Sequence, residues 1–447
     1  MTERLALFGG EPLETNHADL RISWPRVSQD DRGAILATFD RGDFSGRSSS
    51  EVRALEDEMA AYFGMPFGTA LNSGTSALHA ALHSLGVKSD DEVIVPNLTF
   101  VATAMAVLHN GSIPRFADVD CNSYNLTAKT IAARITKQTK AVIVVHMHGT
   151  PAEIDPIIAL CRQHNIRLIE DVAQAPGAKY KGKFVGSFGD ASVFSLMSQK
   201  NLATCGECGV LLSKTLQAKN AAERLRIYGE VVRPGRSRAY NSYTLGWNYT
   251  LNPIQAAMAR IQLAKFSELT AEIRRAAVGL SMALKVFKWV SPPNDGATYE
   301  GVFHFYRFGL DPAPVGYTDK GRFRKAVQDA LAAEGLNTRQ YQNCPISGQP
   351  VFRSPPFDKM ADYNIELYPN VLEVLRSTLV LGGIGSSPAY LLKDGTTEKY
   401  VAGFAKIDEN IDELIAYARS LDYSEPWHSV PKTSDSLNAE YVADNSD

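Results

Sequence analysis

Two residues of this chain could hold and activate a flat cofactor that bears an aldehyde. Residues 168–171 (LIED) have the pattern of a buried strand that ends in the carboxylate of Asp171, and Lys200 follows at the end of residues 194–200 (FSLMSQK). Pyridoxal phosphate (PLP) needs one fixed amine, which binds its aldehyde, and one fixed carboxylate, which keeps its ring nitrogen protonated. Any chain of this size contains an aspartate and a lysine, so the pair gains meaning only from its surroundings.

Other short segments could bind the remainder of such a cofactor. Residues 72–76 (NSGTS) precede a predicted helix, where Gly74 and Thr75 would offer free N–H groups and the positive end of the helix dipole to a phosphate. An ordinary N-cap fits the same residues. Phe100 follows a strand and could stack on a ring or pack in the core, and Ser195 could bind the phosphate or occupy a turn.

The elements that must position these residues alternate between strands and helices. Apolar residues at helical spacing predict helices, and continuous apolar runs predict buried strands. The expected helices are 52–63, 76–85 and 154–164, and the expected strands are 93–96, 141–145 and 168–171. This alternation predicts an α/β fold with a mostly parallel sheet. Ligands bind such sheets at the carboxyl ends of the strands, where Asp171 is expected to lie.

The pattern changes at about residue 253. Residues 254–280 predict a long connecting helix, 303–308 a strand and 322–334 a helix. We therefore predict a large α/β domain, a smaller C-terminal α+β domain and a mobile tail. Their expected bounds are 1–252, with an N-terminal segment that could pack on the small domain, then 253–422 and 423–447.

Composition narrows the class of protein. The chain has 447 residues, of which 45% are hydrophobic and 21% charged, as in ordinary globular proteins. The net charge of −3 provides no field that would attract nucleic acid or an anionic membrane. No apolar run approaches the roughly 18 residues of a membrane span, and the first residues lack a signal-peptide core. A cytoplasmic location is therefore expected.

Five sparse cysteines argue against a disulfide framework. Cys205 and Cys208 have CxxC spacing, but a zinc site would need a second such pair, which the sequence lacks. A redox pair would be expected at the start of a helix after a strand, whereas this pair lies in a loop that follows Lys200. We expect no metal site and a loop without special thiol chemistry, with a redox pair as the alternative.

Seven blocks, in this order, resemble the DegT/DnrJ/EryC1/StrS family of PLP-dependent sugar aminotransferases, and the resemblance runs from about residue 5 to 422. The blocks are 43–46 (DFSG), 71–78 (LNSGTSAL), 91–96 (DEVIVP), 145–149 (VHMHG), 169–175 (IEDVAQA), 194–200 (FSLMSQK) and 245–249 (LGWNY). The opening residues 5–12 (LALFGGEP), followed by Trp24 and Pro25, are similar to the branch with glutamine:scyllo-inosose aminotransferases and amino-hydroxybenzoate synthases.

This resemblance implies the fold of aspartate aminotransferase (PLP-dependent fold type I) and a homodimer with active sites at the subunit interface. It also implies a role for each matching residue. Lys200 would bind PLP covalently, and Asp171 would hold the ring nitrogen. Gln174 would lie beside the ring hydroxyl, and Phe100 would stack on the ring. The phosphate would be bound by Gly74, Thr75 and Ser195, and Asn248 would reach it from the second subunit.

The implied reaction moves an amino group from L-glutamine or L-glutamate to a keto-cyclitol or keto-sugar in natural-product biosynthesis of the aminoglycoside type. Pyridoxamine phosphate would be the intermediate form of the cofactor. The alternatives are an epimerase or another PLP reaction on a sugar-like substrate, and a non-catalytic PLP-binding regulatory protein. Sugar dehydratases of the family carry histidine where Lys200 stands, so the lysine argues against dehydration.

Two residues depart from the family pattern. Cys208 stands where the family has a glycine, and a glycine there would permit a positive φ that cysteine tolerates poorly. Thr250 stands where arginine is common, which puts a usual substrate contact in doubt. Arg233, Arg236 and Arg238 could meet a donor carboxylate or a substrate phosphate, or they could belong to a solvated loop. His146 and His148 could line the pocket or end a strand, and Ser45, Gly46 and Arg47 could form a substrate loop.

Overall fold

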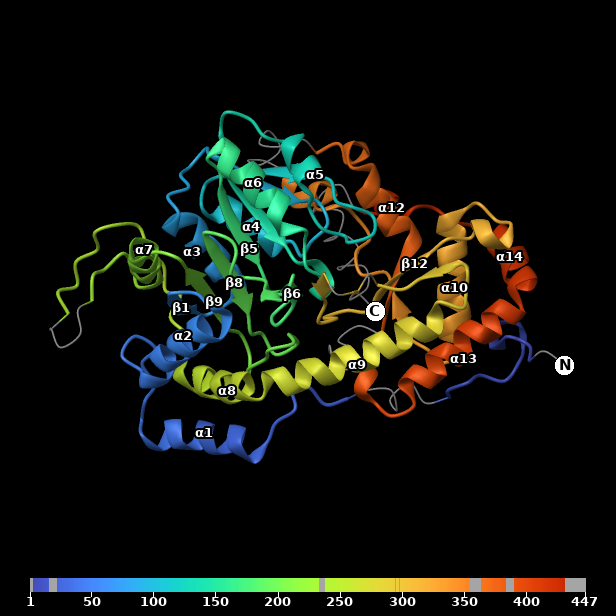
Figure 1. The fold of residues 1–447 in the computed structure, drawn as a ribbon, viewed down its shortest axis with the longest axis horizontal. Coiled ribbons are helices and arrows are strands. Elements are labelled where there is room, and N and C mark those ends of the chain that lie inside the picture. The colour runs from blue at the N-terminus through green and yellow to red at the C-terminus, as the bar shows by residue number, and fades with distance from the viewer. Residues whose placement is uncertain are drawn as a thin grey trace, which may run out of the picture.

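A seven-stranded sheet forms the centre of the larger part of the molecule (Figure 1). The computed structural model describes residues 3–15, 22–232, 238–293, 295–296, 298–353, 363–382 and 390–430. The strand order is β1-β9-β8-β5-β4-β2-β3. The bounds are β1 (Phe67–Leu71), β2 (Glu92–Pro96), β3 (Ile113–Ala117), β4 (Thr139–Val145), β5 (Arg167–Asp171), β8 (Ala191–Ser195) and β9 (Gly209–Ser213).

Most of this sheet is parallel, as the alternation of strands and helices predicted. Strands β3, β2, β4, β5 and β8 pair in parallel, whereas β9 is antiparallel to both β8 and β1. The central strands are buried on both faces, which explains why the sequence shows continuous apolar runs there. The parallel direction brings the carboxyl ends of β5 and β8 to the same edge of the sheet.

Helices cover both faces of the sheet. Buried side chains from several helices join the core of one face, and side chains from several others join the core of the opposite face. The first group includes α2 (Ser50–Phe63), α6 (Ile154–His164) and α8 (Pro253–Ala264), and the second includes α3 (Gly74–Ser84), α4 (Ala102–His109) and α7 (Leu216–Arg226). The short α5 (Ala128–Ala132) joins the first face, and α1 (Gln29–Asp40) lies outside, against α8.

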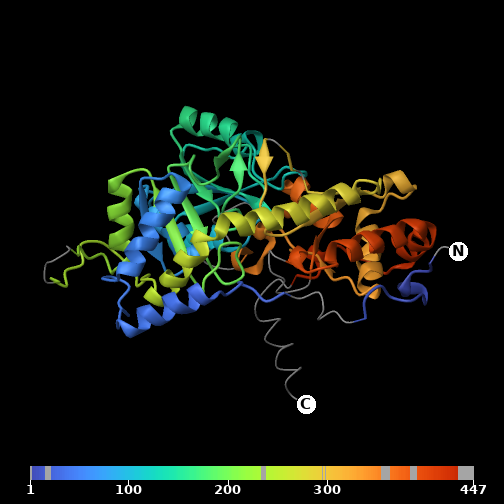
Figure 2. The ribbon, with the colours of Figure 1, turned by 60° about the horizontal axis from the view of Figure 1, so that its bottom comes forward.

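The smaller part is built around a second sheet of order β10-β12-β14-β13. Its strands are β10 (Val290–Ser291), β12 (Arg307–Leu310), β13 (Thr338–Arg339) and β14 (Thr378–Leu381), and its helices are α9 (Phe266–Leu284), α10 (Lys320–Ala333), α13 (Thr396–Glu409) and α14 (Ile411–Ser420). The predicted connecting helix is two helices, α8 and α9, that meet at Lys265 (Figure 2). Of the predicted strand 303–308, only the end from Arg307 lies in a strand.

The two ends of the described chain pack on opposite parts of the molecule. The N-terminal segment lies beside α13 and α14 (Figure 2), where Leu5 is fully buried. The carboxylate of Glu334 accepts hydrogen bonds from the backbone N–H of Ala6 at 2.7 Å and of Leu13 at 3.2 Å. These contacts explain how residues far from α10 in sequence complete the smaller core.

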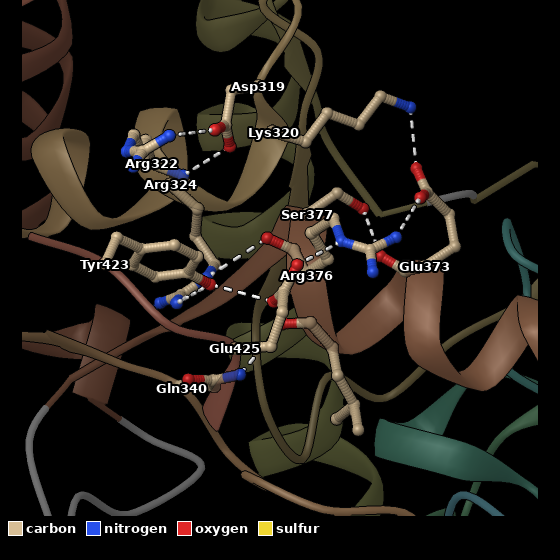
Figure 3. Close-up of polar contacts among 11 residues, drawn as sticks. Asp319, Lys320, Arg322, Arg324, Gln340, Glu373, Arg376, Ser377, Tyr423 and Glu425 are labelled. Atoms are coloured by element: carbon tan, nitrogen blue, oxygen red, sulfur yellow. Dashed lines mark hydrogen bonds and ion pairs between the residues drawn. The ribbon is translucent and has the colours of Figure 1, made fainter. Parts of the chain in front are cut away.

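The C-terminal segment runs from α14, in the smaller part, to the core of the larger part. Trp427 is 5% exposed and joins the core on the α3 face of the larger sheet. Figure 3 shows the polar contacts that hold this crossing: the Arg376 guanidinium pairs with Glu425 at 2.5 Å, and the Tyr423 hydroxyl donates to Glu425 at 2.9 Å. Arg376 also lies over the Trp427 ring at 5.4 Å. Residues 423–430 are therefore packed, unlike the predicted mobile tail, and 431–447 lie outside the described residues.

Smaller elements complete the architecture. A three-stranded sheet of order β11-β6-β7 joins residues from both parts of the chain, namely β6 (Lys179–Tyr180), β7 (Lys183–Phe184) and β11 (Tyr299–Glu300). The remaining helices are α11 (Pro350–Arg353) and α12 (Pro369–Ser377). Within the described ranges, none of the helices combines the length and the apolar character that crossing a membrane requires.

Candidate functional site

A cavity of about 790 Å³ lies at the carboxyl ends of β5 and β8. Seven of the eight predicted cofactor residues line it: Gly74, Thr75, Phe100, Asp171, Gln174, Ser195 and Lys200. Asn248 is not among the lining residues and is exposed in the single chain. Residues from the second part of the chain close the cavity, and these are His304, Phe305, Arg339, Gln340 and Tyr341.

The N-terminus of α3 forms one end of the cavity. The Ser73 hydroxyl accepts a hydrogen bond from the N–H of Ser76 at 3.1 Å, and the Ser76 hydroxyl accepts one from the N–H of Ser73 at 3.1 Å. This capping box leaves the N–H groups of Gly74 and Thr75 for a ligand. A Cβ on Gly74 would lie 2.8 Å from the Cβ of Ser195, so the two backbones can meet only because residue 74 is glycine. The result is a compact cradle suited to a phosphate.

Phe100 provides a flat apolar surface beside this cradle. Its side chain is 58% exposed although it lines the cavity, so its ring is not used by the core. Of the two interpretations that the sequence left open, core packing is wrong, and a surface for ring stacking remains.

Asp171 is held as an oriented carboxylate at the end of β5. The Thr103 hydroxyl, from α4, donates to Oδ2 at 3.1 Å, and the N–H of Ala173 donates to Oδ1 at 3.1 Å. Burial raises the pKa of Asp171, while these hydrogen bonds and the charge of Lys200 lower it. A buried carboxylate of this kind is suited to stabilise a cation, such as a protonated ring nitrogen.

The neighbouring Glu170 fixes the segment that lies between β7 and β8. It accepts hydrogen bonds from the N–H groups of Gly186, Phe188 and Gly189 at 2.8, 2.8 and 2.7 Å. His146 Nε2 lies 3.1 Å from Glu170, and His146 Nδ1 accepts from a backbone N–H at 3.0 Å, so Nε2 carries the proton. His146 therefore has a structural role rather than a place in the cavity that the described residues form.

Lys200 is half-buried beside these groups. Burial lowers the pKa of its amine to about 8, and the charges of Asp171 and Glu207 partly oppose this effect. The backbone of Lys200 is also fixed. Its N–H donates to the carbonyl of Met197 at 2.8 Å, and its carbonyl accepts a hydrogen bond from the indole N–H of Trp24 at 3.0 Å. A lysine with this pKa is partly neutral near physiological pH, as a nucleophile or base must be.

Gln174 has its amide oriented by His148. The N–H of His148 donates to Gln174 Oε1 at 2.8 Å, which leaves the amide nitrogen as the donor. Burial raises the pKa of the neighbouring Tyr341 hydroxyl, and the charges of Arg339 and Arg307, together with Gln174, partly oppose this effect. The His148 ring lies behind the cavity, with Nε2 3.0 Å from Arg307, and burial and that guanidinium hold its pKa well below the ordinary value.

The loop that follows Lys200 explains how Cys208 replaces a glycine. The residue with a positive φ is Gly206, at 111°, and Cys208 has an ordinary backbone conformation. The Cys208 side chain is fully buried in the core, whereas Cys205 is exposed. The backbone of this loop therefore has its positive φ at Gly206, so Cys208 does not have to adopt the left-handed conformation that a glycine would permit. No group of three or more histidine, cysteine or acidic residues gathers as a metal site within the described ranges.

The described residues 228–232 and 238–246 form an arm that leaves the body of the molecule next to α7 (Figure 1). Tyr240 and Leu245 on this arm are 72% and 74% exposed. Where the arm returns, the Thr250 hydroxyl donates to Asn248 Oδ1 at 2.8 Å. Of the three arginines considered from the sequence, Arg238 pairs with Glu230 at 2.5 Å, and Arg233 and Arg236 lie outside the described residues.

Some residues of the site had no signal in the sequence. Thr103, Glu207, His304, Arg339 and Tyr341 line the cavity but belong to no motif with a recognisable spacing. Trp24 was noted only as part of a family block, and its contact with Lys200 follows from the fold. A signal for the second-part residues could have come only from knowing how the two sheets pack.

Comparisons with known proteins agree with this site. The DegT/DnrJ/EryC1/StrS aminotransferase family model matches residues 27–366. The chain is 38% identical to UDP-N-acetyl-3-dehydro-alpha-D-glucosamine 3-aminotransferase of Acidithiobacillus ferrooxidans (68% of this chain, 77% of the relative). It is 30% identical to a putative L-glutamine:3-amino-2,3-dideoxy-scyllo-inosose aminotransferase of Streptomyces kanamyceticus (75% and 79%).

Solved structures confirm the predicted fold type I. The structure of 3-amino-5-hydroxybenzoic acid synthase superimposes with a TM-score of 0.74 at 26% identity and covers 89% of this chain and 100% of that one. DesV of S. venezuelae, solved with a ketimine intermediate, superimposes with a TM-score of 0.73 at 26% identity (88% and 95%).

The groups that line the cavity fit PLP. The cradle at Gly74 excludes any side chain, and the Gln174 amide has a free donor. The carboxylate of Asp171 is buried, and partial burial lowers the pKa of the Lys200 amine to about 8. Together with the family match, these features identify the chain as a PLP-dependent aminotransferase that belongs to the DegT/DnrJ/EryC1/StrS family.

Proposed function

We propose that this enzyme moves an amino group from L-glutamine or L-glutamate to a keto-cyclitol or keto-sugar in natural-product biosynthesis. The observation that carries the proposal is the meeting of Gly74, Thr75, Phe100, Asp171, Gln174, Ser195 and Lys200 in one cavity. Relatives named for a keto-sugar and for a keto-cyclitol support the acceptor class. The names of these relatives do not choose between the two kinds of acceptor, and the proposal covers both.

In this proposal each side chain has a definite task. The N–H groups of Gly74 and Thr75 and the hydroxyl of Ser195 bind the phosphate of PLP, and Gln174 donates to the ring hydroxyl. Phe100 stacks on the ring. When bound, PLP supplies an electron sink for the pair released when the Cα–H bond breaks.

The two catalytic residues are Lys200 and Asp171. Asp171 keeps the ring nitrogen protonated, because a buried carboxylate favours a cation beside it. Lys200 would bind the cofactor and be displaced by the amino donor. It would then take the proton from the substrate Cα as a general base and deliver it to carbon C4′ of the cofactor as a general acid. Its pKa of about 8 allows both tasks near neutral pH.

We also propose that the enzyme works as a homodimer. The described residues of the arm, 228–232 and 238–246, expose large apolar side chains, which a second copy would cover. Asn248 does not contribute to the cavity of its own described chain, so its amide would reach the phosphate of the partner. The hydroxyl of Thr250 already occupies Oδ1 of this amide, which leaves the nitrogen to donate.

The test is the visible absorption spectrum of the purified protein before and after addition of L-glutamine or L-glutamate, without an acceptor. A yellow band that changes to the aminated form, with release of one keto acid per site, supports the transamination. The variant Lys200→Ala should lose this change. A yellow band that neither donor alters would favour an epimerase or a regulatory PLP-binding protein, and the absence of a band after incubation with PLP would overturn the proposal.

A further inference from the structure

His304 is a buried side chain of the cavity to which the reaction described above assigns no task. It is 3% exposed and comes from the second part of the chain. Its Nδ1 lies 2.9 Å from Oδ1 of Asn201, the residue that follows the catalytic lysine. Nδ2 of Asn201 donates to the carbonyl of Val302 at 2.9 Å. This bond identifies Oδ1 as the acceptor, so Nδ1 of His304 carries the hydrogen and Nε2 bears the lone pair.

The lone pair on Nε2 is open to the cavity. Nε2 makes no hydrogen bond to any residue that the structure describes. Among the described residues, Nδ1 of His148 is a buried polar atom without a hydrogen-bond partner. Nε2 of His304 also has no partner among these residues, but it is not one of the buried atoms. Because His304 lines the cavity, the accessible nitrogen faces a ligand rather than the protein core.

The ring stays neutral and therefore keeps this lone pair. Burial, and then the positive charges of Lys200 and Arg339, hold the pKa of His304 well below its ordinary value. A neutral imidazole can accept a hydrogen bond at Nε2, whereas an imidazolium could only donate.

The backbone holds His304 in a fixed position. Gly149 has a φ of 92°, and a Cβ on it would lie 2.8 Å from the nitrogen of Phe303 and 3.0 Å from the nitrogen of His304. The N–H of Val302 donates to the carbonyl of Gly149 at 3.0 Å. The ring of Phe305 also lies against the imidazole, with centroids 4.2 Å apart. A hydrogen-bond acceptor anchored in this way can discriminate between ligands.

The remaining polar groups of the cavity indicate what this acceptor binds. The N–H groups of the phosphate cradle, the Gln174 amide, Lys200 and Arg339 are donors, and the carboxylates of Asp171 and Glu207 are the charged acceptors. A second ammonium group next to His304 would be repelled by Lys200 and Arg339, whose charges reach it. A neutral donor, such as a hydroxyl group, fits the position without this repulsion.

We propose that Nε2 of His304 accepts a hydrogen bond from a hydroxyl group of the keto substrate and so selects polyhydroxylated ketones. This inference rests on the proposed function, because it assigns a specificity residue to the same acceptor. It adds that the acceptor is recognised through a hydroxyl on the side of the cavity that the second part of the chain provides.

The test compares the wild-type enzyme with His304→Asn. The asparagine amide nitrogen takes the place of Nδ1 and keeps the contact with Asn201, while the Nε2 acceptor is lost. The probes are scyllo-inosose and UDP-N-acetyl-3-dehydro-α-D-glucosamine, each with its monodeoxy analogues, added to enzyme that L-glutamate has already aminated. For the ketone that the wild type converts, kcat/KM should fall about 10-fold in the variant, as expected for one lost hydrogen bond.

The analogues identify the bond itself. For one monodeoxy analogue, the wild type should show the same loss of about 10-fold, and His304→Asn should show no further loss. The affinity of the unreactive scyllo-inositol or UDP-N-acetylglucosamine, measured by calorimetry, should fall by a similar factor in the variant, while PLP affinity and the glutamate half-reaction stay within about 3-fold.

The possible failures can be distinguished. If kcat/KM of the variant equals that of the wild type, or if the losses from the variant and from every analogue multiply, the role of His304 is refuted while the proposed function stands. If the wild type converts neither ketone, the acceptor class itself is wrong, and the inference falls with it.

Discussion

Thr103→Val tests whether the environment of Asp171 controls the acid limit of the reaction. The Thr103 hydroxyl donates to Asp171 Oδ2 at 3.1 Å, and valine has nearly the same shape without the donor. A hydrogen bond to a charged group contributes about 1.5–3 kcal/mol, and one pKa unit corresponds to about 1.4 kcal/mol. Burial already raises the pKa of Asp171, and the loss of this bond should raise it by about 1–2 units more.

The assay is the rate of the half-reaction with L-glutamate, followed by the absorption of the bound cofactor in a stopped-flow instrument from about pH 5 to pH 9. A carboxyl with a higher pKa is neutral over a wider acidic range, so the acid limb of the profile should move to higher pH by about 1–2 units. On the alkaline side of that limb, where Asp171 is ionised in both proteins, the rates should differ by less than about 3-fold.

Thr103→Ser is the matched control, because it keeps the hydroxyl and removes only a methyl group. Its acid limb should coincide with that of the wild type. An unchanged limb in Thr103→Val would refute the link between this hydroxyl and the protonation of Asp171. An equal displacement in both variants would assign the effect to packing.

Three other predictions concern the apoprotein and the backbone around the site. Lys200→Met should stabilise the apoprotein by about 3 kcal/mol at pH 7 in urea denaturation, because the pKa of Lys200 in the folded protein, about 8, lies below the unfolded value of 10.5. Between these two pH values the stability of the wild type should rise, and the stability difference between variant and wild type should shrink. A variant less stable than the wild type at pH 7 would contradict this prediction. Gly149→Ala should lower the urea midpoint and weaken PLP retention, because the new Cβ would lie 2.8 Å from the nitrogen of Phe303. The exposed Gly279→Ala is the control. Equal midpoints in the two variants would show that the backbone around Gly149 shifts freely. In the native protein a thiol reagent should modify Cys205 rapidly and the buried Cys208 only on unfolding, as peptide mapping by mass spectrometry would show, and equal rates would indicate a loop that opens.

The parts of the site that the sequence predicted come from the large sheet. Asp171 ends a strand whose apolar run is visible in the sequence, and the bounds of α6 match the prediction. The strand that ends at Ser195 was not predicted. Gly74 starts a helix with a clear cap. In these places local patterns and the rule for parallel sheets are sufficient to bring the residues together.

The remainder depended on contacts between distant segments. The aromatic residues before Arg307 suggested a strand, yet the backbone of Val302 bonds to Gly149 and its carbonyl to Asn201, so the strand starts later. Trp427 follows a polar segment without periodicity, and only the tertiary structure reveals that the large core buries it. Local sequence patterns do not encode such pairings.

The crossing of the two termini affects how the chain can fold during synthesis. Domains generally fold as they leave the ribosome, with the N-terminal one first. Here the larger core is complete only when Trp427, which is made after the helices of the smaller part, has packed against it. Leu5 is made early but is buried only when those helices have formed. Neither part can bury these apolar side chains before the second part of the chain has been made. The newly made large sheet therefore spends the whole synthesis of the second part with an open core, a period in which a chaperone could bind it.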